Sequence, residues 1–501
     1  MNRNVLQYLE ESAARFPENC ALIDENHRYT YSELLSKSRR VGSALCKKNV
    51  FARPVGVYGE KDCASLFAFF GIVYAGGFYC FLNPELPAGR LSQITDVLSP
   101  KLIITTSAMK DEAAKIFPGL ELATVEELMD EEICEESLRF VRVRAIDTDP
   151  LYINFTSGST GVPKGIVVAH RSVIDFIDCF TETFGINKTD VIANQAPFDF
   201  DVSVKDIYSA LKTGAALAVV PRRLFSVPTE LIDFLCEHKA TVMVWAVSAL
   251  CLLSTFHALD YKIPETVRMI LFSGEVMPNK ALKNFRSHLP ETTYVNLYGP
   301  TEITCNCTYH ILSKERDYAD GIPIGKAFLN EDVFLLDEAD RRVTSPGAVG
   351  EICVRGSALA LGYYSAEKQN ELHFVQNPLN PYYPERIYRT GDLGRFDENG
   401  DLFFSGRKDF QIKYMGHRIE LEEIEREMGA IDGVERCCCI FDEKKSRLKG
   451  FYVGSIEKTA LHELMAKDLP AFMVPGIIRQ VEEMPLTKNG KIDRKKLAEL
   501  K

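Results

Sequence analysis

Apolar and polar positions alternate along the N-terminal part of the chain in patterns that predict short strands and helices in turn. Cys20–Ile23 and residues 55–58 are runs of β-favouring residues. A helix is expected to begin near Tyr31, with Thr30 or Ser32 as its cap. Strands that alternate with helices are typical of βαβ units, so we expect an α/β fold with mostly parallel sheets.

The same alternation continues through the middle of the chain. Residues 172–184 have the periodicity of a helix, and residues 240–253, 269–272 and 294–298 have the apolar composition of buried strands. Residues 111–138 are rich in acidic side chains, and we expect them to form a solvated connector.

Residues 65–82 contain no charged side chain and are nearly long enough to span a bilayer. The segment nevertheless contains Gly76 and Gly77 and many aromatic residues, and Arg90 follows closely. A helix that ends at the two glycines and leads into a buried strand explains the pattern, so we expect no membrane span.

Composition narrows the class of protein. A chain of 501 residues with 46% apolar residues is long enough for two or three domains. A net charge of −11 argues against a nucleic-acid-binding protein, which needs a basic face. The fourteen cysteines have no zinc-ligand spacing, and the N-terminus shows no secretory signal, so reduced thiols and a cytoplasmic location are expected.

The strongest candidate site is a glycine- and hydroxyl-rich loop between two apolar runs. It comprises Thr156, Ser157, Gly158, Ser159, Thr160, Gly161 and, shortly after, Lys164. Glycines let several backbone N–H groups converge, and the hydroxyls and the lysine add donors and charge, which suits a polyphosphate. The spacing is not that of a Walker A loop. We interpret it as a nucleotide-phosphate loop in preference to an ordinary hairpin loop.

Residues 156–165, with the sequence TSGSTGVPKG, resemble the phosphate loop of the adenylate-forming superfamily, which comprises acyl-CoA synthetases, peptide-synthetase adenylation domains and luciferases. Further motifs follow in the family's order, namely NLYGPTE at 296–302, YRTGD at 388–392, GRKDFQIK at 406–413 and LTKNGKIDR at 486–494. The resemblance covers nearly the whole chain. It is closest to amino-acid-activating domains, including stand-alone D-alanine–carrier protein ligases.

The resemblance implies an ATP site. Tyr298 would stack on adenine, Asn296 would read its exocyclic amine, Thr301 would contact the α-phosphate or the substrate carboxylate, and Glu302 would offer an oxygen to Mg²⁺. Asp392 and Arg407 would hold the ribose, with a plain salt bridge as the alternative. The implied ATP-binding residues are Thr156, Ser157, Gly158, Ser159, Thr160, Gly161, Lys164, Gly274, Asn296, Tyr298, Gly299, Asp392 and Arg407.

The resemblance also implies an amino-acid pocket. In the family an aspartate at the position of Asp201 binds the substrate's α-ammonium group, whereas the alternative for Asp199 and Asp201 is a helix cap. The other pocket positions are Val202, Lys205, Trp245, Leu271, Ser273, Leu297, Cys305 and Asn306. They favour a small substrate such as serine, alanine of either hand or cysteine. Lys205 would suit an acidic substrate, unless it extends out of the pocket.

We expect a large N-terminal adenylation domain at 1–408 and a small, mobile α+β domain at 409–501, with Asp409 as the hinge. In the family the lysine at the position of Lys491 swings in to bridge the substrate carboxylate, the ribose and the α-phosphate, and Gly416 would line a pantetheine tunnel. Tyr414 and Met415 depart from the family's pattern beside it.

The implied function is that of a ligase that uses ATP and Mg²⁺ to form aminoacyl-AMP and then loads a phosphopantetheine thiol. The chain ends soon after Lys491 without a carrier attachment site, so a separate carrier protein is the expected partner. An acyl-CoA synthetase is the alternative within the same fold, although Asp201 argues against it. A non-catalytic nucleotide sensor is the alternative from another class.

Overall fold

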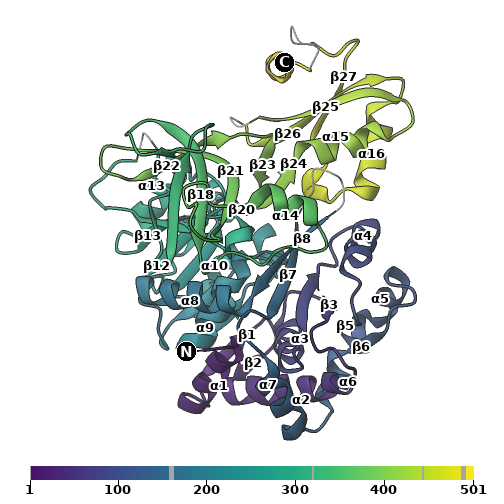
Figure 1. Cartoon of the computed structure of the whole chain (residues 1–501), viewed down its shortest axis with the longest axis vertical. Helices are drawn as coiled ribbons and strands as arrows, with labels where there is room; N and C mark the ends of the chain where they lie inside the picture. Colours follow the sequence, from purple (N-terminus) through teal and green to yellow (C-terminus); the bar gives the residue numbers. More distant parts are fainter. Residues whose placement is uncertain (1, 157–162, 319–320, 443–444, 487–491, 501) are drawn as a thin grey trace. The chain divides into compact units, whose positions relative to one another are not determined.

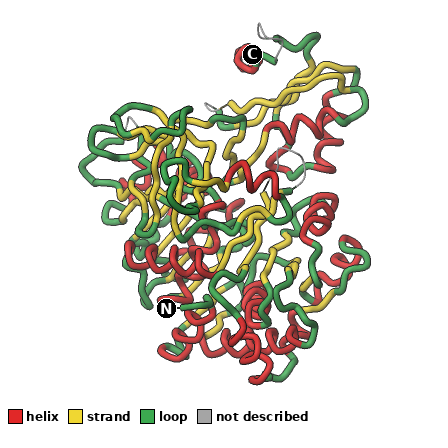
Figure 2. Tube along the Cα trace, in the orientation of Figure 1, coloured by secondary structure: helices red, strands yellow, loops and turns green. Residues whose placement is uncertain are grey.

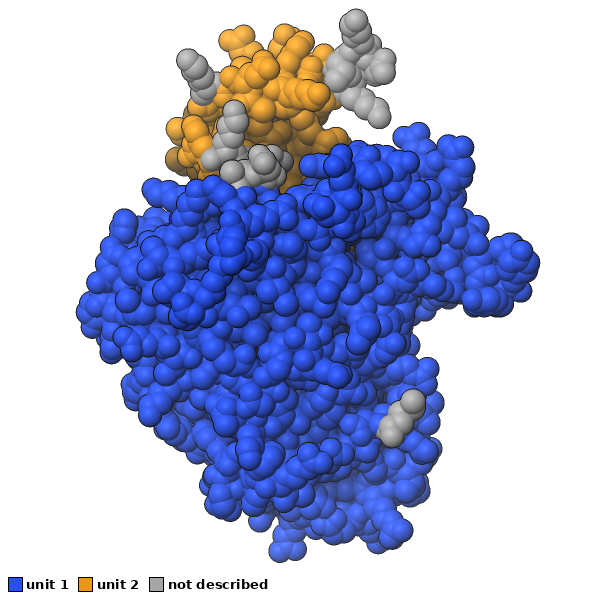
Figure 3. All heavy atoms as spheres, turned by 90° about the vertical axis from the view of Figure 1, so that its left-hand side faces the viewer, with its two compact units in different colours: residues 1–83, 98–154, 165–408 blue, residues 84–97, 155–164, 409–501 orange. Residues whose placement is uncertain are grey.

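The computed structural model describes residues 2–156, 163–318, 321–442, 445–486 and 492–500 (Figures 1 and 2). The chain divides into two compact units (Figure 3), which comprise residues 1–83, 98–154 and 165–408, and residues 84–97, 155–164 and 409–501. The fold is mixed α/β, with large N-terminal sheets and a smaller C-terminal domain, which confirms the predicted class. A hinge at Asp409 remains a prediction.

A nine-stranded sheet carries four of the nine predicted substrate positions, namely Trp245, Leu271, Ser273 and Leu297. Its strands run in the order β15 (Lys326–Ala327), β14 (Thr308–Ile311), β13 (Thr293–Tyr298), β12 (Met269–Ser273), β11 (Val242–Ala246), β9 (Val191–Asn194), β10 (Ala216–Val219), β1 (Cys20–Ile23) and β2 (Arg28–Thr30). The strands from β13 to β1 pair in parallel, and the outer ones pair antiparallel. Apolar clusters cover both faces, which explains why the central strands read as continuous apolar runs.

A seven-stranded sheet has the order β19 (Gly362–Tyr363), β8 (Lys164–Ala169), β7 (Pro150–Thr156), β4 (Phe78–Leu82), β3 (Pro54–Tyr58), β5 (Ile103–Thr105) and β6 (Leu122–Thr124). The strands from β7 to β6 are parallel. The charge-free segment forms the buried helix α3 (Cys63–Tyr74) followed by β4, as expected. Among the described residues, no helix is both long and apolar enough to cross a membrane.

The third sheet of the large unit is antiparallel throughout, so the expectation of mostly parallel sheets holds for the first two only. It has the order β17 (Arg342–Val343), β16 (Glu331–Leu336), β18 (Val349–Gly356), β21 (Arg386–Phe396) and β20 (Phe374–Gln376), and β22 (Leu402–Arg407) also pairs with β21. Antiparallel neighbours can be joined by short turns, so this sheet needs no crossover helices.

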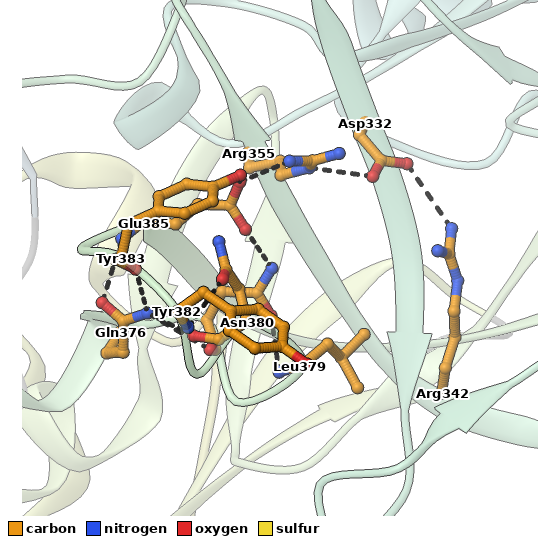
Figure 4. Close-up of polar contacts among 10 residues, drawn as sticks. Asp332, Arg342, Arg355, Gln376, Leu379, Asn380, Tyr382, Tyr383 and Glu385 are labelled. Carbon is orange, nitrogen blue, oxygen red and sulfur yellow. Dashed lines mark hydrogen bonds and ion pairs between the residues drawn. The ribbon is translucent and has the colours of Figure 1, made fainter.

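The loop that joins β20 to β21 has a well-bonded structure of its own (Figure 4). The side-chain amide of Gln376 donates to the carbonyls of Asn380 and Tyr383, at 2.9 and 3.1 Å. Glu385 accepts from Arg355 of the neighbouring strand. These bonds hold the loop although the side chain of Tyr382 is 90% exposed.

Helices cover the sheets. Those of the large unit are α1 (Leu6–Arg15), α2 (Tyr31–Cys46), α3, α5 (Lys110–Ile116), α6 (Val125–Met129), α7 (Glu135–Arg144), α8 (His170–Phe184), α9 (Val202–Thr213), α10 (Pro228–Glu237), α11 (Val247–Thr255), α12 (Ala258–Tyr261), α13 (Asn279–His288) and α14 (Glu367–His373), with 3₁₀ turns η1 (Ser107–Met109), η2 (Arg222–Ser226) and η3 (Thr301–Ile303). Thr30, rather than Ser32, caps α2 in a capping box with Glu33.

The prediction of a solvated connector at residues 111–138 is wrong. The segment contributes α5, β6, α6 and the start of α7, and it buries Ala113, Val125, Leu128 and Leu138. Its many acidic residues lie on the exposed faces of short helices. The high acidic content therefore suggested a solvated segment, although the apolar residues between the acidic ones are buried.

The smaller unit contains an α+β domain. After α4 (Ala88–Leu98), which belongs largely to this unit, come β23 (Gln411–Tyr414), β24 (His417–Glu420), α15 (Leu421–Gly429), β25 (Val434–Asp442), β26 (Arg447–Gly454), α16 (Lys458–Asp468), η4 (Ala471–Met473), β27 (Ile477–Gln480) and α17 (Arg494–Glu499). Met415 and Gly416 form the two-residue turn between β23 and β24, with φ of 53° and 81°. Such a turn requires left-handed backbone, which favours glycine.

Candidate active site

Asp201 lies at the N-cap position of α9 without acting as a cap. Its side chain makes no capping hydrogen bond, and the residue is only 9% exposed. Its backbone is held instead. The Asp201 N–H lies 3.1 Å from the side-chain amide of Asn154, whose oxygen accepts from it in the amide orientation that satisfies both groups, and the Asp201 carbonyl accepts from the Cys305 thiol at 3.1 Å. The structure therefore presents a buried carboxylate at a fixed position, which the capping alternative does not explain.

Asp199, two residues earlier, has a different environment. Its carboxylate accepts from the side-chain amide of Asn83 at 3.3 Å. Burial raises the pKa of Asp199 to about 6. Because Asp199 carries the same side chain two residues from Asp201 and contacts Asn83, it is a matched comparison for Asp201.

Lys205 points into the protein. It is fully buried, and its ammonium group donates to the side-chain oxygen of Asn306 at 2.5 Å. Burial lowers the pKa of Lys205, and the nearby Cys305, Asp201 and Asp206 oppose that shift. The alternative in which Lys205 extends to solvent is thereby excluded, and two predicted pocket residues are joined directly.

The carboxylate of Asp206 lies behind this pair. It accepts from the Asn194 amide at 2.8 Å, and burial raises the pKa of Asp206 to about 7. Lys61 donates to the carbonyls of Asn194 and Gln195, at 3.0 Å each, and burial lowers the pKa of Lys61 to about 7. Asp206 thus interacts electrostatically with both Lys61 and Lys205.

The predicted pocket role of Trp245 is wrong. In a strand, neighbouring side chains point to opposite faces. On β11, Val244 is in register with Leu271 and belongs to the same apolar cluster as Leu271, Leu297 and Cys305. Trp245 belongs to the cluster on the other face, where its ring packs 5.5 Å from that of Phe225.

Val244 is the β11 residue that shares a face with the predicted pocket residues, and the sequence interpretation missed it. Val244 can be identified by its register with Leu271, and that register is known only once the two strands are paired. Val202 packs against the same cluster, and the buried Ser273 follows Leu271 by two positions on that face.

We expect Trp245→Phe to reduce stability and to leave substrate preference unchanged. The indole N–H donates to the carbonyl of Ala193 at 2.8 Å, and its loss leaves a buried acceptor unpaired, which costs about 1–3 kcal/mol. Urea denaturation would measure the loss. A changed order of preferred substrates would contradict the assignment of Trp245 to the opposite face.

Three of the predicted nucleotide-binding residues meet at the end of β13. The phenol of Tyr298 donates to Asp392 at 2.5 Å, and Arg407, opposite Asp392 on β22, forms an ion pair with the other carboxylate oxygen. Burial raises the pKa of Tyr298. The side chains offer donors and acceptors suited to a nucleoside, although the ion pair also fits the salt-bridge alternative.

Asn296 and Gly299 flank this group. The side-chain amide of Asn296 donates to the carbonyl of Pro323 at 2.8 Å. A Cβ atom at Gly299 would lie 2.5 Å from the Cα of Asn306, so only glycine allows the turn after β13 to approach this segment. The close approach brings the Tyr298 turn beside the pocket residue Asn306. Gly274 follows β12 in left-handed backbone, with φ of 96°.

Glu302 is buried within η3, so it is not a surface carboxylate. One of its oxygens accepts from the phenol of Tyr363 at 2.6 Å, and Thr301 beside it is partly exposed. The described residues contain no group of three or more His, Cys, Asp or Glu side chains that could hold a metal ion. A single carboxylate nevertheless fits Mg²⁺, which commonly takes one or two protein carboxylates together with substrate phosphates.

The remaining predicted residues are placed as follows. Thr156 ends β7 and Lys164 begins β8, whereas Ser157, Gly158, Ser159, Thr160, Gly161 and Lys491 lie outside the described residues. Asp409 and Gly416 belong to the smaller unit. All fourteen cysteines are free thiols.

Comparison with known proteins gives two adjoining matches. A family model described as AMP-binding enzyme matches residues 9–364, and one described as AMP-binding enzyme C-terminal domain matches residues 423–491. The first match covers the nine-stranded and seven-stranded sheets, and the second covers most of the C-terminal domain. Strands β21 and β22, which carry Asp392 and Arg407, lie between the two matches.

Curated relatives include large synthases. Tyrocidine synthase 1 of Brevibacillus parabrevis is 30% identical over 99% of this chain, and bacitracin synthase 1 of Bacillus licheniformis is 30% identical over 99%. The chain spans only 45% and 9% of these two proteins. Zwittermicin A synthase ZmaJ of Bacillus cereus is 32% identical over 99% of this chain and 95% of its own length.

Solved structures agree with these matches. PA1221, described as an NRPS protein containing adenylation and PCP domains, has a TM-score of 0.84 at 27% identity over 99% of this chain and 84% of its own. The adenylation domain AlmE of Vibrio cholerae, solved with glycyl-adenosine-5'-phosphate, has a TM-score of 0.87 at 23% identity over 99% and 97% of the two chains, and it supports the fold alone.

Proposed function

Because the chain belongs to the family of AMP-binding enzymes, we propose that it activates an amino acid with ATP and loads it onto the phosphopantetheine thiol of a separate carrier protein. The family match and the relatives support an adenylate-forming ligase of the type found in nonribosomal peptide synthetases. We propose in addition that its substrate is an amino acid, that it uses Mg²⁺ and that a carrier protein accepts the product.

The buried carboxylate of Asp201 is the observation that carries the amino-acid substrate. A buried carboxylate offers the α-ammonium group of an amino acid a counter-charge, which the ammonium group needs when it leaves water. The backbone of Asp201 is fixed by Asn154 and Cys305, so the carboxylate has a defined position in which to meet an α-ammonium group. A fatty or aromatic acid has no such group, which disfavours the acyl-CoA synthetase alternative.

Two group transfers follow from this arrangement. A carboxylate oxygen of the substrate attacks the α-phosphorus of ATP, and the bond to the bridging oxygen breaks, which releases pyrophosphate. The carrier's thiolate then attacks the acyl carbonyl, and AMP leaves. In-line displacement increases negative charge near the α-phosphate, so the expected contributions of the chain are the Lys491 ammonium and the Thr301 hydroxyl.

The other residues bind and orient. Tyr298 and Asn296 would hold the adenine, Asp392 and Arg407 would hold the ribose, and Lys164, with the loop that begins at Thr156, would hold the phosphates. Mg²⁺, when bound by Glu302 and the phosphates, would offset their charge.

We expect Lys205→Met to test the class of side chain that the pocket takes. If the substrate is acidic, loss of the buried ammonium should reduce kcat/KM by about 10²-fold or more, because a buried carboxylate would lose its partner. If the substrate is small and uncharged, the change should be smaller and should fall mainly on stability. Kinetics with the preferred amino acid, beside thermal unfolding, separate the two.

The experiment that tests the proposed function is ATP–pyrophosphate exchange with each of the twenty amino acids and with D-alanine. We rank a small amino acid first and an acidic one second, because of the side chains at the predicted pocket positions Val202, Leu271, Ser273 and Leu297. Exchange supported only by aromatic or long aliphatic acids would overturn the proposal. Binding of ATP without any exchange would favour a nucleotide sensor instead.

A separate assay tests the second half-reaction. The holo form of a candidate carrier protein and free coenzyme A would be offered in parallel to the activated amino acid. Thioester formation on the carrier alone supports the proposal, whereas formation on coenzyme A alone identifies an acyl-CoA-synthetase-type ligase.

A further inference from the structure

The C-terminal segment is tied to the rest of its domain through one guanidinium group. Arg494, the first residue of α17, donates to both carboxylate oxygens of Glu425 on α15, at 2.7 and 2.9 Å. The same group donates to the carbonyl of Cys439 on β25. Its carbon lies 4.3 Å from the centre of the Phe410 ring.

The carboxylate of Glu425 also contacts the three-stranded sheet. Besides Arg494, it accepts from the backbone N–H of Cys439 at 2.5 Å. The Arg494 and Glu425 side chains are only 21% and 18% exposed, so solvent screens their interaction little. A bidentate, partly buried pair of this kind fixes orientation as well as distance.

The two residues before Arg494 are bonded to an earlier part of the chain. Ile492 forms an antiparallel bridge with Leu486, and the Asp493 N–H donates to the Pro485 carbonyl at 2.7 Å. Lys491, which lies outside the described residues, directly precedes Ile492 in the sequence. Ile492 and Leu497 also pack against the apolar cluster on this face of the three-stranded sheet.

Phe410, which Arg494 contacts, lies next to the predicted hinge in the sequence. Phe410 directly follows Asp409 in the chain, and it is 52% exposed although Arg494 lies over its ring. The Arg494 side chain, at the start of α17, thus contacts α15, β25 and the residue after the predicted hinge.

We propose that Arg494 is a positioning residue, which anchors the start of α17, three residues after Lys491 in the chain, to α15 through Glu425 and to the residue after the predicted hinge through Phe410. The inference rests on the proposed function, because it concerns how Lys491 is presented. When the domain turns about Asp409, this connection carries the lysine with it. A side chain that is misplaced by about 1 Å can lose about 10²-fold in rate, so the connection affects turnover rather than substrate affinity.

Arg494→Lys tests the geometry and Arg494→Met tests the charge. A lysine keeps the positive charge but cannot bond both carboxylate oxygens in a fixed plane. In the full-length protein we expect both variants to lower kcat of pyrophosphate exchange by about 10–10²-fold, with KM for ATP and for the amino acid within about two-fold of the wild type. A rise in KM with kcat unchanged would overturn the proposal.

Lys449→Met is the matched control for a loss of stability alone. The Lys449–Asp442 ion pair, at 2.7 Å, lies in the same sheet and is similarly buried, with side chains 13% and 17% exposed. We expect the control to lower Tm about as much as Arg494→Met does and to leave kcat unchanged. If both variants lower kcat equally, or if Arg494→Met lowers only Tm, Arg494 has a structural role and the proposal fails.

A double variant separates this proposal from the function on which it rests. If Arg494 acts through Lys491, Lys491→Ala combined with Arg494→Met should be no slower than Lys491→Ala alone. Multiplied losses would overturn the proposal. No exchange in the wild type with any amino acid would instead refute the proposed function, and a fully active Lys491→Ala would refute the role of Lys491 itself.

Discussion

Replacement of Lys491 by alanine is expected to slow formation of the aminoacyl-adenylate by about 10²–10³-fold, the range typical of losing one preorganised electrostatic contact in the transition state. The attacking carboxylate and the α-phosphate are both anionic, and a positioned ammonium group offsets their repulsion. Pyrophosphate exchange at saturating ATP and amino acid measures the effect directly.

Lys495→Ala is the control for this experiment. Lys495 lies four positions further along the chain, on the exposed side of α17, and its removal changes the net charge by the same amount. Exchange by the Lys495 variant should match that of the wild type. If Lys491→Ala also behaves like the wild type, the catalytic role proposed for Lys491 is refuted.

Replacement of Asp201 by asparagine is expected to lower kcat/KM for the amino acid by about 10²–10³-fold, because the α-ammonium group would be buried without its counter-charge. The backbone contacts of Asp201 to Asn154 and Cys305 do not involve the carboxylate, so the side chain can change without their loss. KM for ATP should stay the same. Exchange measured against varied amino-acid concentration gives both constants.

Two comparisons sharpen the test of Asp201. Asp199→Asn removes a partly buried carboxylate two residues away that is bonded to Asn83, and it should change kcat/KM little. A des-amino analogue of the best substrate should compete poorly with that substrate in the wild type and much better in the Asp201 variant. Unchanged discrimination against the analogue would show that Asp201 does not bind the amine.

The sequence by itself determined where the elements lie and which chemistry to look for. The apolar runs located β1, β3, β12 and β13, since strands buried on both faces are apolar at every position. The resemblance to the adenylate-forming superfamily also brought Tyr298, Asp392 and Arg407 into one hypothesis, and in the structure both Tyr298 and Arg407 contact Asp392. The first inference depends on local pattern, and the second depends on three separate motifs that the family brings together.

Local pattern failed where burial was sparse. The sequence of residues 111–138 suggested a solvated connector because it contains ten acidic side chains. The helices α5 and α6 are short, and each buries only one or two side chains against the rest of the unit. Most of the stability of such helices comes from tertiary packing rather than from their own sequence.

Tertiary structure alone decided which way the side chains face. The two-residue period of a strand allows either Val244 or Trp245 to line the pocket, and only the register of β11 with β12 selects Val244. The inward direction of Lys205 depends on Asn306, which lies 101 positions away in sequence. The contact of Arg494 with Glu425 joins α17 to α15 in the same way. Contacts between distant residues are created by folding, so no local pattern in the chain encodes them.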